Sequence, residues 1–171
     1  MTYTNLDTAT PSLPPGLMQR SAHAAQLEAT VLYAIARLRS EVFVVEQACP
    51  YLDLDGSDLE PGAEQFWAEV EGAAADARIA ATLRVLQEDE ATRIGRVATA
   101  PAWRGRGLAA ALMRAAVTAH DKGTPDRPIV LDAQSYLTEW YARFGFLQHG
   151  EEFLEDEIPH TPMRREPRTH A

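Results

Sequence analysis

The stretch that decides the fold runs from Arg96 to Ala109 and reads RVATAPAWRGRGLA. Its pattern predicts a strand that ends at Thr99, a short loop that passes Pro101, and a glycine-containing turn that opens a helix. The first amides of a helix have no carbonyl partner within the helix, and the helix dipole places positive charge beside them. A corner of this kind therefore attracts phosphate groups.

The turn itself has the composition of a pyrophosphate cradle. Gly105 and Gly107 let the backbone approach an anion closely and adopt dihedral angles that a Cβ atom would forbid. Arg104 and Arg106 add positive charge. An ordinary strand–turn–helix corner would use glycine in the same way, so the residues alone leave both interpretations open.

Hydrophobic periodicity extends the reading in both directions along the chain. Upstream, it predicts an amphipathic helix over residues 28–39 and strands over 65–71, 78–87 and 92–99. Downstream, it predicts a helix from Gly107 to about His120, a buried strand over 128–133, a helix capped by Ser135 that ends near Phe144, and strands over 146–154 and 160–165. The β-branched segment 41–47 fits either a continued helix or a loop.

This element order predicts an α/β fold. The strand–helix–strand unit centred on Gly107 implies a parallel strand pair with a right-handed crossover. The hairpin before it adds antiparallel strands. We therefore expect a mixed, mostly antiparallel sheet with helices on both faces.

Length and composition suit one domain. The chain has 171 residues and no linker or repeat between its ends. We expect a flexible arm over residues 1–21, a single domain over 22–166 and a polar tail over 167–171. Cys49 is the single cysteine of the sequence, so no intrachain disulfide is possible, and we expect a partly buried thiol.

Charge and hydropathy narrow the classes of partner. The formal net charge of −9 repels nucleic acid and mildly favours cationic partners. The sequence has no apolar run of about 20 residues that would span a membrane, and its first twenty residues do not read as a secretory signal. We expect a cytoplasmic protein without a membrane or nucleic-acid partner. The five histidines lack metal-ligand spacing, so we expect no metal.

Two motifs together resemble the GNAT acyltransferases. Arg104-x-x-Gly107-x-Ala109, placed after a strand, resembles the acetyl-CoA motif of that family. The run YARFGF from Tyr141 to Phe146 resembles a second family motif, at the expected distance. Further stretches at 38–47, 49–51, 53–59 and 158–160 resemble the ElaA-like branch of the family.

The resemblance implies that acetyl-CoA is the acyl donor. A bulge in the strand 96–99 would part it from its parallel neighbour and free the amides of Val97 and Thr99 for pantetheine. An amide near Val97 would also polarise the thioester carbonyl. The pyrophosphate would be held by the backbone of Arg104, Gly105, Arg106, Gly107, Leu108 and Ala109. Tyr141 would protonate the departing thiolate, although its helical apolar stripe also fits an ordinary core tyrosine.

The acceptor implied by the resemblance is an amine of a small molecule or a peptide. Because many members of the family are dimers, the resemblance also allows a homodimer. A protonated amine must lose a proton, directly or through water. Glu46 is our first candidate for the base, and Asp53, Asp55 and His160 are others. Arg39, Asp53 and His160 are candidate substrate-binding residues, but Arg39 is also placed for a plain salt bridge to Asp53 or Asp55.

Two other functions fit part of the pattern. Arg39, Phe43, Asp53 and Asp55 also resemble the start of an acyl-homoserine-lactone synthase. A domain that binds acyl-CoA without turnover is the other alternative. Formation of a lactone from S-adenosylmethionine would identify the first, and acetyl-CoA binding without amine acylation would identify the second.

Overall fold

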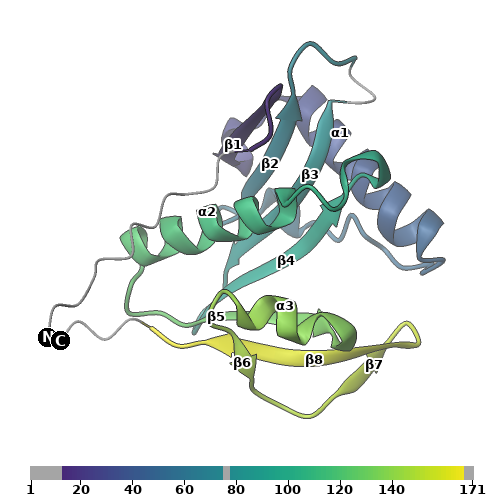
Figure 1. Ribbon diagram of the computed structural model, residues 1–171. Coiled ribbons are helices and arrows are strands. Elements are labelled where there is room, and N and C mark those ends of the chain that lie inside the picture. The colour runs from purple at the N-terminus through teal and green to yellow at the C-terminus, as the bar shows by residue number, and fades with distance from the viewer. Residues whose placement is uncertain (1–12, 75–77, 168–171) are drawn as a thin grey trace, which may run out of the picture.

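One mixed sheet runs through the protein. The computed structural model describes residues 13–74 and 78–167, and within them the strand order is β1-β2-β3-β4-β5-β8-β6, with β7 paired to β8 (Figure 1). The strands are β1 (Leu17–His23), β2 (Glu64–Val70), β3 (Ile79–Gln87), β4 (Thr92–Thr99), β5 (Ile129–Gln134), β6 (Leu147–Gln148), β7 (Phe153–Glu155) and β8 (Ile158–Arg165).

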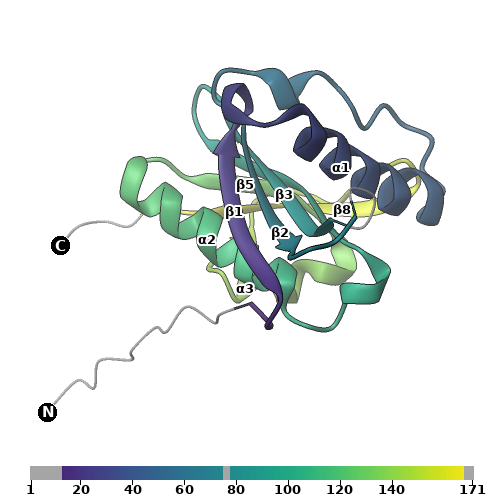
Figure 2. The ribbon, with the colours of Figure 1, turned by 90° about the horizontal axis from the view of Figure 1, so that it is seen from above.

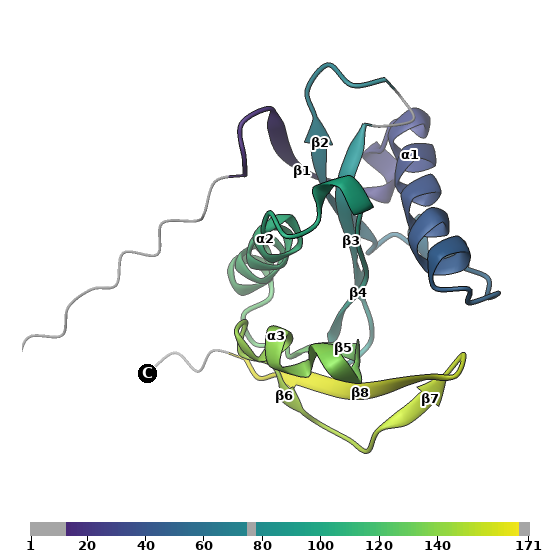
Figure 3. The same ribbon diagram turned by 45° about the vertical axis from the view of Figure 1, so that its right-hand side comes forward.

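Helices cover both faces of the sheet. They are α1 (Ala29–Arg39), its continuation η2 (Ser40–Glu46), α2 (Leu108–Gly123) and α3 (Thr138–Ala142), with single 3₁₀ turns η1 (Ala24–Gln26), η3 (Ser57–Leu59), η4 (Pro101–Trp103) and η5 (Ser135–Leu137). Helix α1 lies on one side of β2–β4, and α2 lies on the other (Figures 2 and 3). This arrangement confirms the predicted α/β architecture.

Each covering helix buries an apolar stripe of the predicted period. Leu108, Leu112 and Met113 of α2 join the main core with the inner faces of β2–β5. On the opposite side, Ile35 and Leu38 of α1 pack in a second cluster that includes residues of β2–β4.

The range predicted for the N-terminal arm includes part of a strand. Residues Leu17–Ser21 belong to β1, which pairs antiparallel with β2 from Leu17↔Val70 to His23↔Glu64. The prediction of an arm up to residue 21 is therefore wrong for this part, and residues 1–12 lie outside the described residues. Strand β1 is an exposed edge strand without apolar alternation, so its sequence carries no strand signal.

The C-terminal segment differs from prediction in two details. The strand predicted over 146–154 is two short strands, β6 and β7, which both pair with β8. Ser135 does not cap a helix. Its hydroxyl instead pairs with that of Thr161 at 2.9 Å, and α3 ends at Ala142 rather than near Phe144.

The open choice at residues 41–47 resolves as helix. Helix α1 runs directly into η2, whose π-type turns end where the Gln47 amide donates to the Val42 carbonyl at 3.1 Å. A π-helical turn is rare and frequent at functional sites.

Strands β4 and β5 pair only briefly. Their parallel register covers Thr92↔Ile129 and Arg93↔Val130, after which the strands diverge (Figures 1 and 3). Strand β4 also carries one extra residue against β3, because Thr82 pairs with Ala98 whereas Arg84 pairs with Gly95. The bulge predicted for this strand is therefore present.

A buried charge cluster ties α1 to the sheet. It comprises the buried residues Arg39, Asp53, Asp58 and Arg84 and the more exposed Asp55. The Arg39 side chain is 0% exposed and donates to Asp53 at 3.0 Å and to Asp58 at 2.6 Å. Arg39 and Asp53 are both buried and are not part of the cleft wall, so these contacts favour a structural role over the predicted substrate-binding role, which stays a prediction. The salt bridge that was the alternative is what the structure shows.

Removing Arg39 from this cluster should destabilise the fold. We expect Arg39→Ala to lower the free energy of unfolding by about 3–5 kcal/mol, because the buried carboxylates of Asp53 and Asp58 each lose one of their two arginine partners. The matched control is Arg37→Ala on the same helix, where an exposed i,i+4 pair with Glu41 is lost and the change should stay within about 0.5 kcal/mol. Urea unfolding of both variants measures this, and equal losses would contradict the structural role of Arg39.

Candidate acyl-CoA and acceptor site

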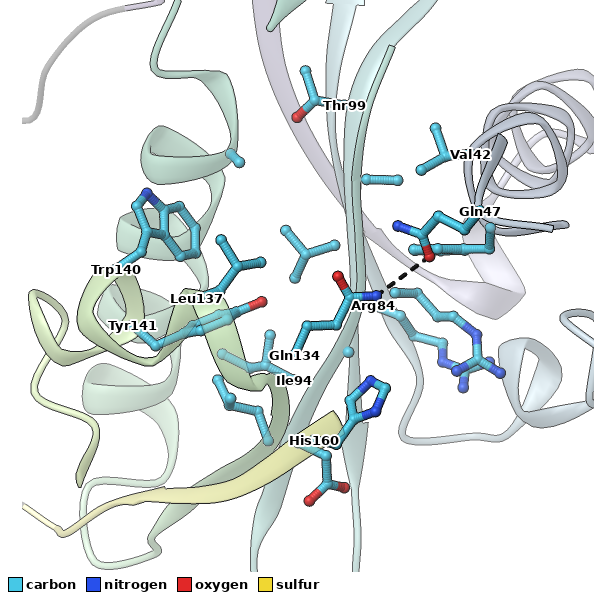
Figure 4. Close-up of a pocket in the computed structure, with 18 of the residues that line it drawn as sticks. Val42, Gln47, Arg84, Ile94, Thr99, Gln134, Leu137, Trp140, Tyr141 and His160 are labelled. Carbon is cyan, nitrogen blue, oxygen red and sulfur yellow. Dashed lines mark hydrogen bonds between the residues drawn. The ribbon is translucent and has the colours of Figure 1, made fainter. Parts of the chain in front are cut away.

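A cleft opens where β4 and β5 part. Its volume is about 1130 Å³, slightly above the usual range of small-molecule pockets, and it suits an extended ligand. The walls come from β4, the start of α2, the α3 region, the end of η2 and β8 (Figure 4). Both predicted motifs therefore face one cavity.

The glycine turn lies at one end of this cleft. Gly105 and Gly107 adopt φ angles of 71° and 77°, in the left-handed region that favours glycine. Gly107 is the N-cap residue of α2. Its carbonyl accepts a hydrogen bond from the Ala111 amide, which is the first hydrogen bond of the helix. The amides of the first turn of α2 therefore lack helical partners, as an anion-binding site requires.

The residues predicted to hold the donor are mostly lining residues of the cleft. They are Val97, Thr99, Arg104, Gly105, Gly107, Leu108 and Ala109. Arg106 is the exception among them, because it is not part of the cleft wall and its guanidinium stacks over the Trp103 ring at 4.8 Å.

The backbone N–H and C=O groups of Thr99 point away from β3. The Ala100 amide donates to the Ala80 carbonyl of β3 at 2.9 Å, and neighbouring residues of a strand direct their backbone groups to opposite sides. The Thr99 carbonyl accepts from Arg104 Nε at 3.1 Å on that other side. Beyond Arg93, this edge of β4 has no parallel strand to pair with, so it is open to an extended ligand.

Arg104 and Glu46 bridge the cleft from the cradle to η2. Two hydrogen bonds of 2.7 Å join the guanidinium of Arg104 to both carboxylate oxygens of Glu46. Hydrogen bonding by Arg104 lowers the pKa of Glu46. A carboxylate with a lowered pKa is a weaker proton acceptor, so the structure argues against the prediction that Glu46 is the general base.

Tyr141 combines a buried ring with a hydroxyl that faces the cleft. The residue is 7% exposed, and its ring packs edge-on against Trp140 and Phe146 with centroid distances of 4.8 and 6.3 Å. The hydroxyl points from α3 into the cavity (Figure 4), and no other described residue hydrogen-bonds to it. Burial raises the pKa of this phenol well above its usual value, so it keeps its proton at neutral pH.

His160 lies on the floor of the cleft. It comes from β8 as the partner of Gln134 on β5, and its ring stacks on Phe153 with a centroid distance of 5.9 Å (Figure 4). Nδ1 lies 2.9 Å from the Ile158 carbonyl. A carbonyl only accepts, so Nδ1 carries the proton and Nε2 of the neutral ring is an acceptor.

Asp55 lines the cleft but is committed to arginine. Arg84 binds both of its oxygens at 2.8 and 2.9 Å, and Arg96 approaches at 3.1 Å. Hydrogen bonds from Arg84 hold the pKa of Asp55 well below its usual value. Asp55 is therefore a poor proton acceptor despite its position.

Sequence reasoning missed several residues of the cleft wall. Gln134 donates to Gln47 Oε1 at 3.3 Å across the cavity (Figure 4). Its place at the carboxyl end of a buried strand was a usable signal. Arg84 and Arg96 also line the cleft, but nothing in their strand sequences marks them.

The described residues contain neither a metal-binding cluster nor a membrane-spanning helix. No group of three or more His, Cys, Asp or Glu side chains in 13–74 and 78–167 is arranged to hold a metal ion. Within the same ranges, no helix is long and apolar enough to cross a membrane.

A cleft between parted strands that ends in a glycine cradle is the arrangement expected of a coenzyme A-dependent acyltransferase. Residues 59–167 match the family model described as acetyltransferase (GNAT) domain. The chain belongs to the GNAT family, in its ElaA-like branch.

Relatives along most of the chain support this membership. A UPF0039 protein of Mycobacterium tuberculosis is 44% identical over 150 residues, which cover 85% of this chain and 91% of that protein. The crystal structure of an acyl-CoA N-acyltransferase from Pseudomonas aeruginosa has a TM-score of 0.81 and 41% identity, covering 87% of this chain and 99% of that one. The structure of Escherichia coli ElaA has a TM-score of 0.80 and 36% identity, covering 88% and 99%.

Acyl-homoserine-lactone synthases share the fold at greater distance. The synthase LasI has a TM-score of 0.69 and 13% identity over 88% of this chain and 89% of its own. Identity at that level shows the fold alone.

The cradle is tested by adding bulk and negative charge to it. We expect Gly107→Glu to weaken acetyl-CoA binding at least about 100-fold, because a carboxylate opposes the pyrophosphate. Gly72→Glu is the matched control, since Gly72 has a φ of 69°, open space around it and no place in the cleft. Both variants should lose about 1–2 kcal/mol of stability. Calorimetric titration measures the affinities, and unchanged binding by Gly107→Glu would refute the cradle.

Proposed function

We propose that this protein transfers an acetyl group from acetyl-CoA to a primary amine of a small molecule or peptide, by direct attack in a ternary complex. One observation carries the proposal: the cleft between β4 and β5 joins an open strand edge, a glycine cradle and a tyrosine hydroxyl in one cavity. Family membership supports an acyl-CoA donor generally.

The donor would use the two ends of the cleft differently. Pantetheine is a pseudo-peptide, so its amides match the open edge of β4 at Val97 and Thr99. The pyrophosphate would lie against the amides from Gly105 to Ala109. The acetyl preference rests on the matched family model, which is that of acetyltransferases.

The proposed reaction forms a carbon–nitrogen bond and breaks the carbon–sulfur bond. The amine nitrogen attacks the thioester carbon, and the sulfur leaves as a thiolate that takes a proton from the Tyr141 hydroxyl. Because burial raises the pKa of this phenol, the hydroxyl is protonated at neutral pH, and the form that can donate a proton is present when the thiolate leaves. An amide near Val97 would stabilise the oxygen that gains charge.

We assign the remaining proton transfer to His160. Among the predicted bases, Glu46, Asp53 and Asp55 are engaged with arginines, whereas Nε2 of His160 lies 3.9 Å from the Glu155 carboxylate and keeps an acceptor lone pair in the neutral ring. Tyr141 and His160 reach the cavity from different elements, with Gln134 between them (Figure 4). An acid and a base therefore flank the space in which the thioester and the amine would meet.

The ion pairs of Arg39, Asp53 and Asp55 remove the support for a lactone synthase. That alternative rested on Arg39, Phe43, Asp53 and Asp55. Arg39 and Asp53 are buried in ion pairs with each other, and Asp55 is bound by Arg84. These residues have a sufficient structural role without a second substrate.

The direct test is an amine screen with acetyl-CoA. Benzylamine, tyramine, spermidine, L-lysine and a peptide with a free N-terminal glycine represent the main acceptor classes, and released thiol is measured continuously. Amine-dependent thiol release supports the proposal. Acetyl-CoA binding without release from any amine identifies a binding module instead, and lactone formation from S-adenosylmethionine identifies a synthase.

Loss of the Tyr141 hydroxyl should slow the chemical step alone. We expect Tyr141→Phe to lower kcat by roughly 10²–10⁴-fold with little change in acetyl-CoA affinity, because it removes the proton donor and leaves the ring packing intact. Tyr33→Phe, at an exposed position of α1, is the control and should keep wild-type kcat. Full activity of Tyr141→Phe would make this residue a core tyrosine and nothing more.

The role of His160 is tested with the amine that the wild-type enzyme acylates fastest in the screen. We expect His160→Gln to reduce kcat/KM by about 10²-fold or more while acetyl-CoA affinity is retained. His149→Gln, at an exposed position before β7, should behave as wild type. Added imidazole should partly restore His160→Ala. Unreduced turnover of His160→Gln would mean that water accepts the proton.

A further inference from the structure

Arg96 occupies the bulge that opens the cleft. Leu83 on β3 faces both Arg96 and Val97, because the neighbouring pairs are Thr82↔Ala98 and Arg84↔Gly95. Arg96 has a φ of 55°, in the left-handed region that residues with a Cβ atom rarely adopt. Such a conformation costs free energy and persists only where surrounding contacts hold it.

The Arg96 side chain contacts three residues that can supply this hold. Nε lies 2.8 Å from Asp53 Oδ1, and Nη2 donates to Asp55 Oδ2 at 3.1 Å. The guanidinium also lies over the Tyr51 ring, 5.3 Å from its centroid. All three partners belong to the loop 47–56 that follows η2.

That loop is itself fixed from the far side. Arg39 binds Asp53 from α1 at 3.0 Å, and Arg84 binds both oxygens of Asp55 from β3 at 2.8 and 2.9 Å. The Ser57 amide adds a hydrogen bond of 3.0 Å to Asp55. The two carboxylates that grip Arg96 therefore have little freedom to follow it, and the bulge is held against a rigid support.

We propose that Arg96 is a positioning residue for the acyl donor, which keeps the bulge in its left-handed conformation and so holds the β4 edge ready for the pantetheine arm. The proposal rests on the proposed function, since it assumes that an acyl-CoA occupies the cleft. Arg96 acts through the backbone of Val97, the next residue of the strand, and its guanidinium is occupied by the loop. Tyr51 and Asp55 also line the cleft, so the residues that support the β4 edge are part of the cleft wall.

The test compares two ligands that share the 3′-phosphoadenosine group, of which the bisphosphate lacks the pantetheine arm and one phosphate of the pyrophosphate. We measure binding of acetyl-CoA and of adenosine 3′,5′-bisphosphate to the wild type, Arg96→Gly and Arg96→Lys by calorimetry. Glycine accepts the left-handed backbone but lacks the side chain that fixes it. We expect Arg96→Gly to weaken acetyl-CoA binding about 10–100-fold and to change bisphosphate binding less than about threefold. Arg96→Lys keeps the charge and should lie between.

Each other outcome overturns the proposal in a distinct way. Wild-type acetyl-CoA affinity in Arg96→Gly means that the bulge needs no side-chain support. An equal loss for both ligands in both variants means a general structural role. If the wild-type protein binds neither ligand, the donor site itself is wrong, and that result separates failure of the proposed function from failure of the Arg96 assignment.

Discussion

Strands β4 and β5 pair through two residues and then part, and the main features of the site follow from that parting. Buried backbone amides and carbonyls need partners, and an edge inside a sheet is normally closed by its neighbour. Here the edge of β4 is left open along a cavity of about 1130 Å³. The same strand leads through η4 into the glycine turn and α2, so one continuous segment supplies both the edge and the anion site.

The charge cluster around Arg39 supports β4 from the side of α1 and β3, opposite the edge that is open to the cleft. A buried ion pair is by itself weak evidence for stability, because desolvation offsets much of the attraction. The cluster around Arg39 instead specifies geometry. It connects α1, the loop 47–56, β3 and the bulge through a chain of fixed contacts from Arg39 to Asp53 and from Asp53 to Arg96. The fold thereby joins the loop 47–56 to β4, the strand that the proposed chemistry depends on.

Local patterns predicted the central elements well. The strand 92–99, the helix after Gly107 and the strand near 129–133 lie where period and glycine placement put them. Strand β1 was missed because an exposed edge strand carries no apolar alternation. The split of β6 from β7 depends on how each pairs with β8, which no local pattern encodes.

The site was predictable in outline and not in its pairings. Most of the predicted cradle residues and Tyr141 line the cleft, and their motifs are local. Glu46 was ranked first among the bases on its position after an apolar run, and its bond to Arg104, 58 residues away, is invisible in sequence. The pairing of Arg39 with Asp53 was one of the interpretations that the sequence offered, but the burial of both residues depends on the folded loop.

Calorimetric titration of the wild-type protein with acetyl-CoA, beside S-adenosylmethionine, tests the central claim most directly. The account predicts saturable acetyl-CoA binding with a Kd on the order of micromolar, within the usual range for enzyme substrates, and no binding of S-adenosylmethionine. Absence of acetyl-CoA binding would contradict it, because the parted strands and the cradle would then have no donor to hold.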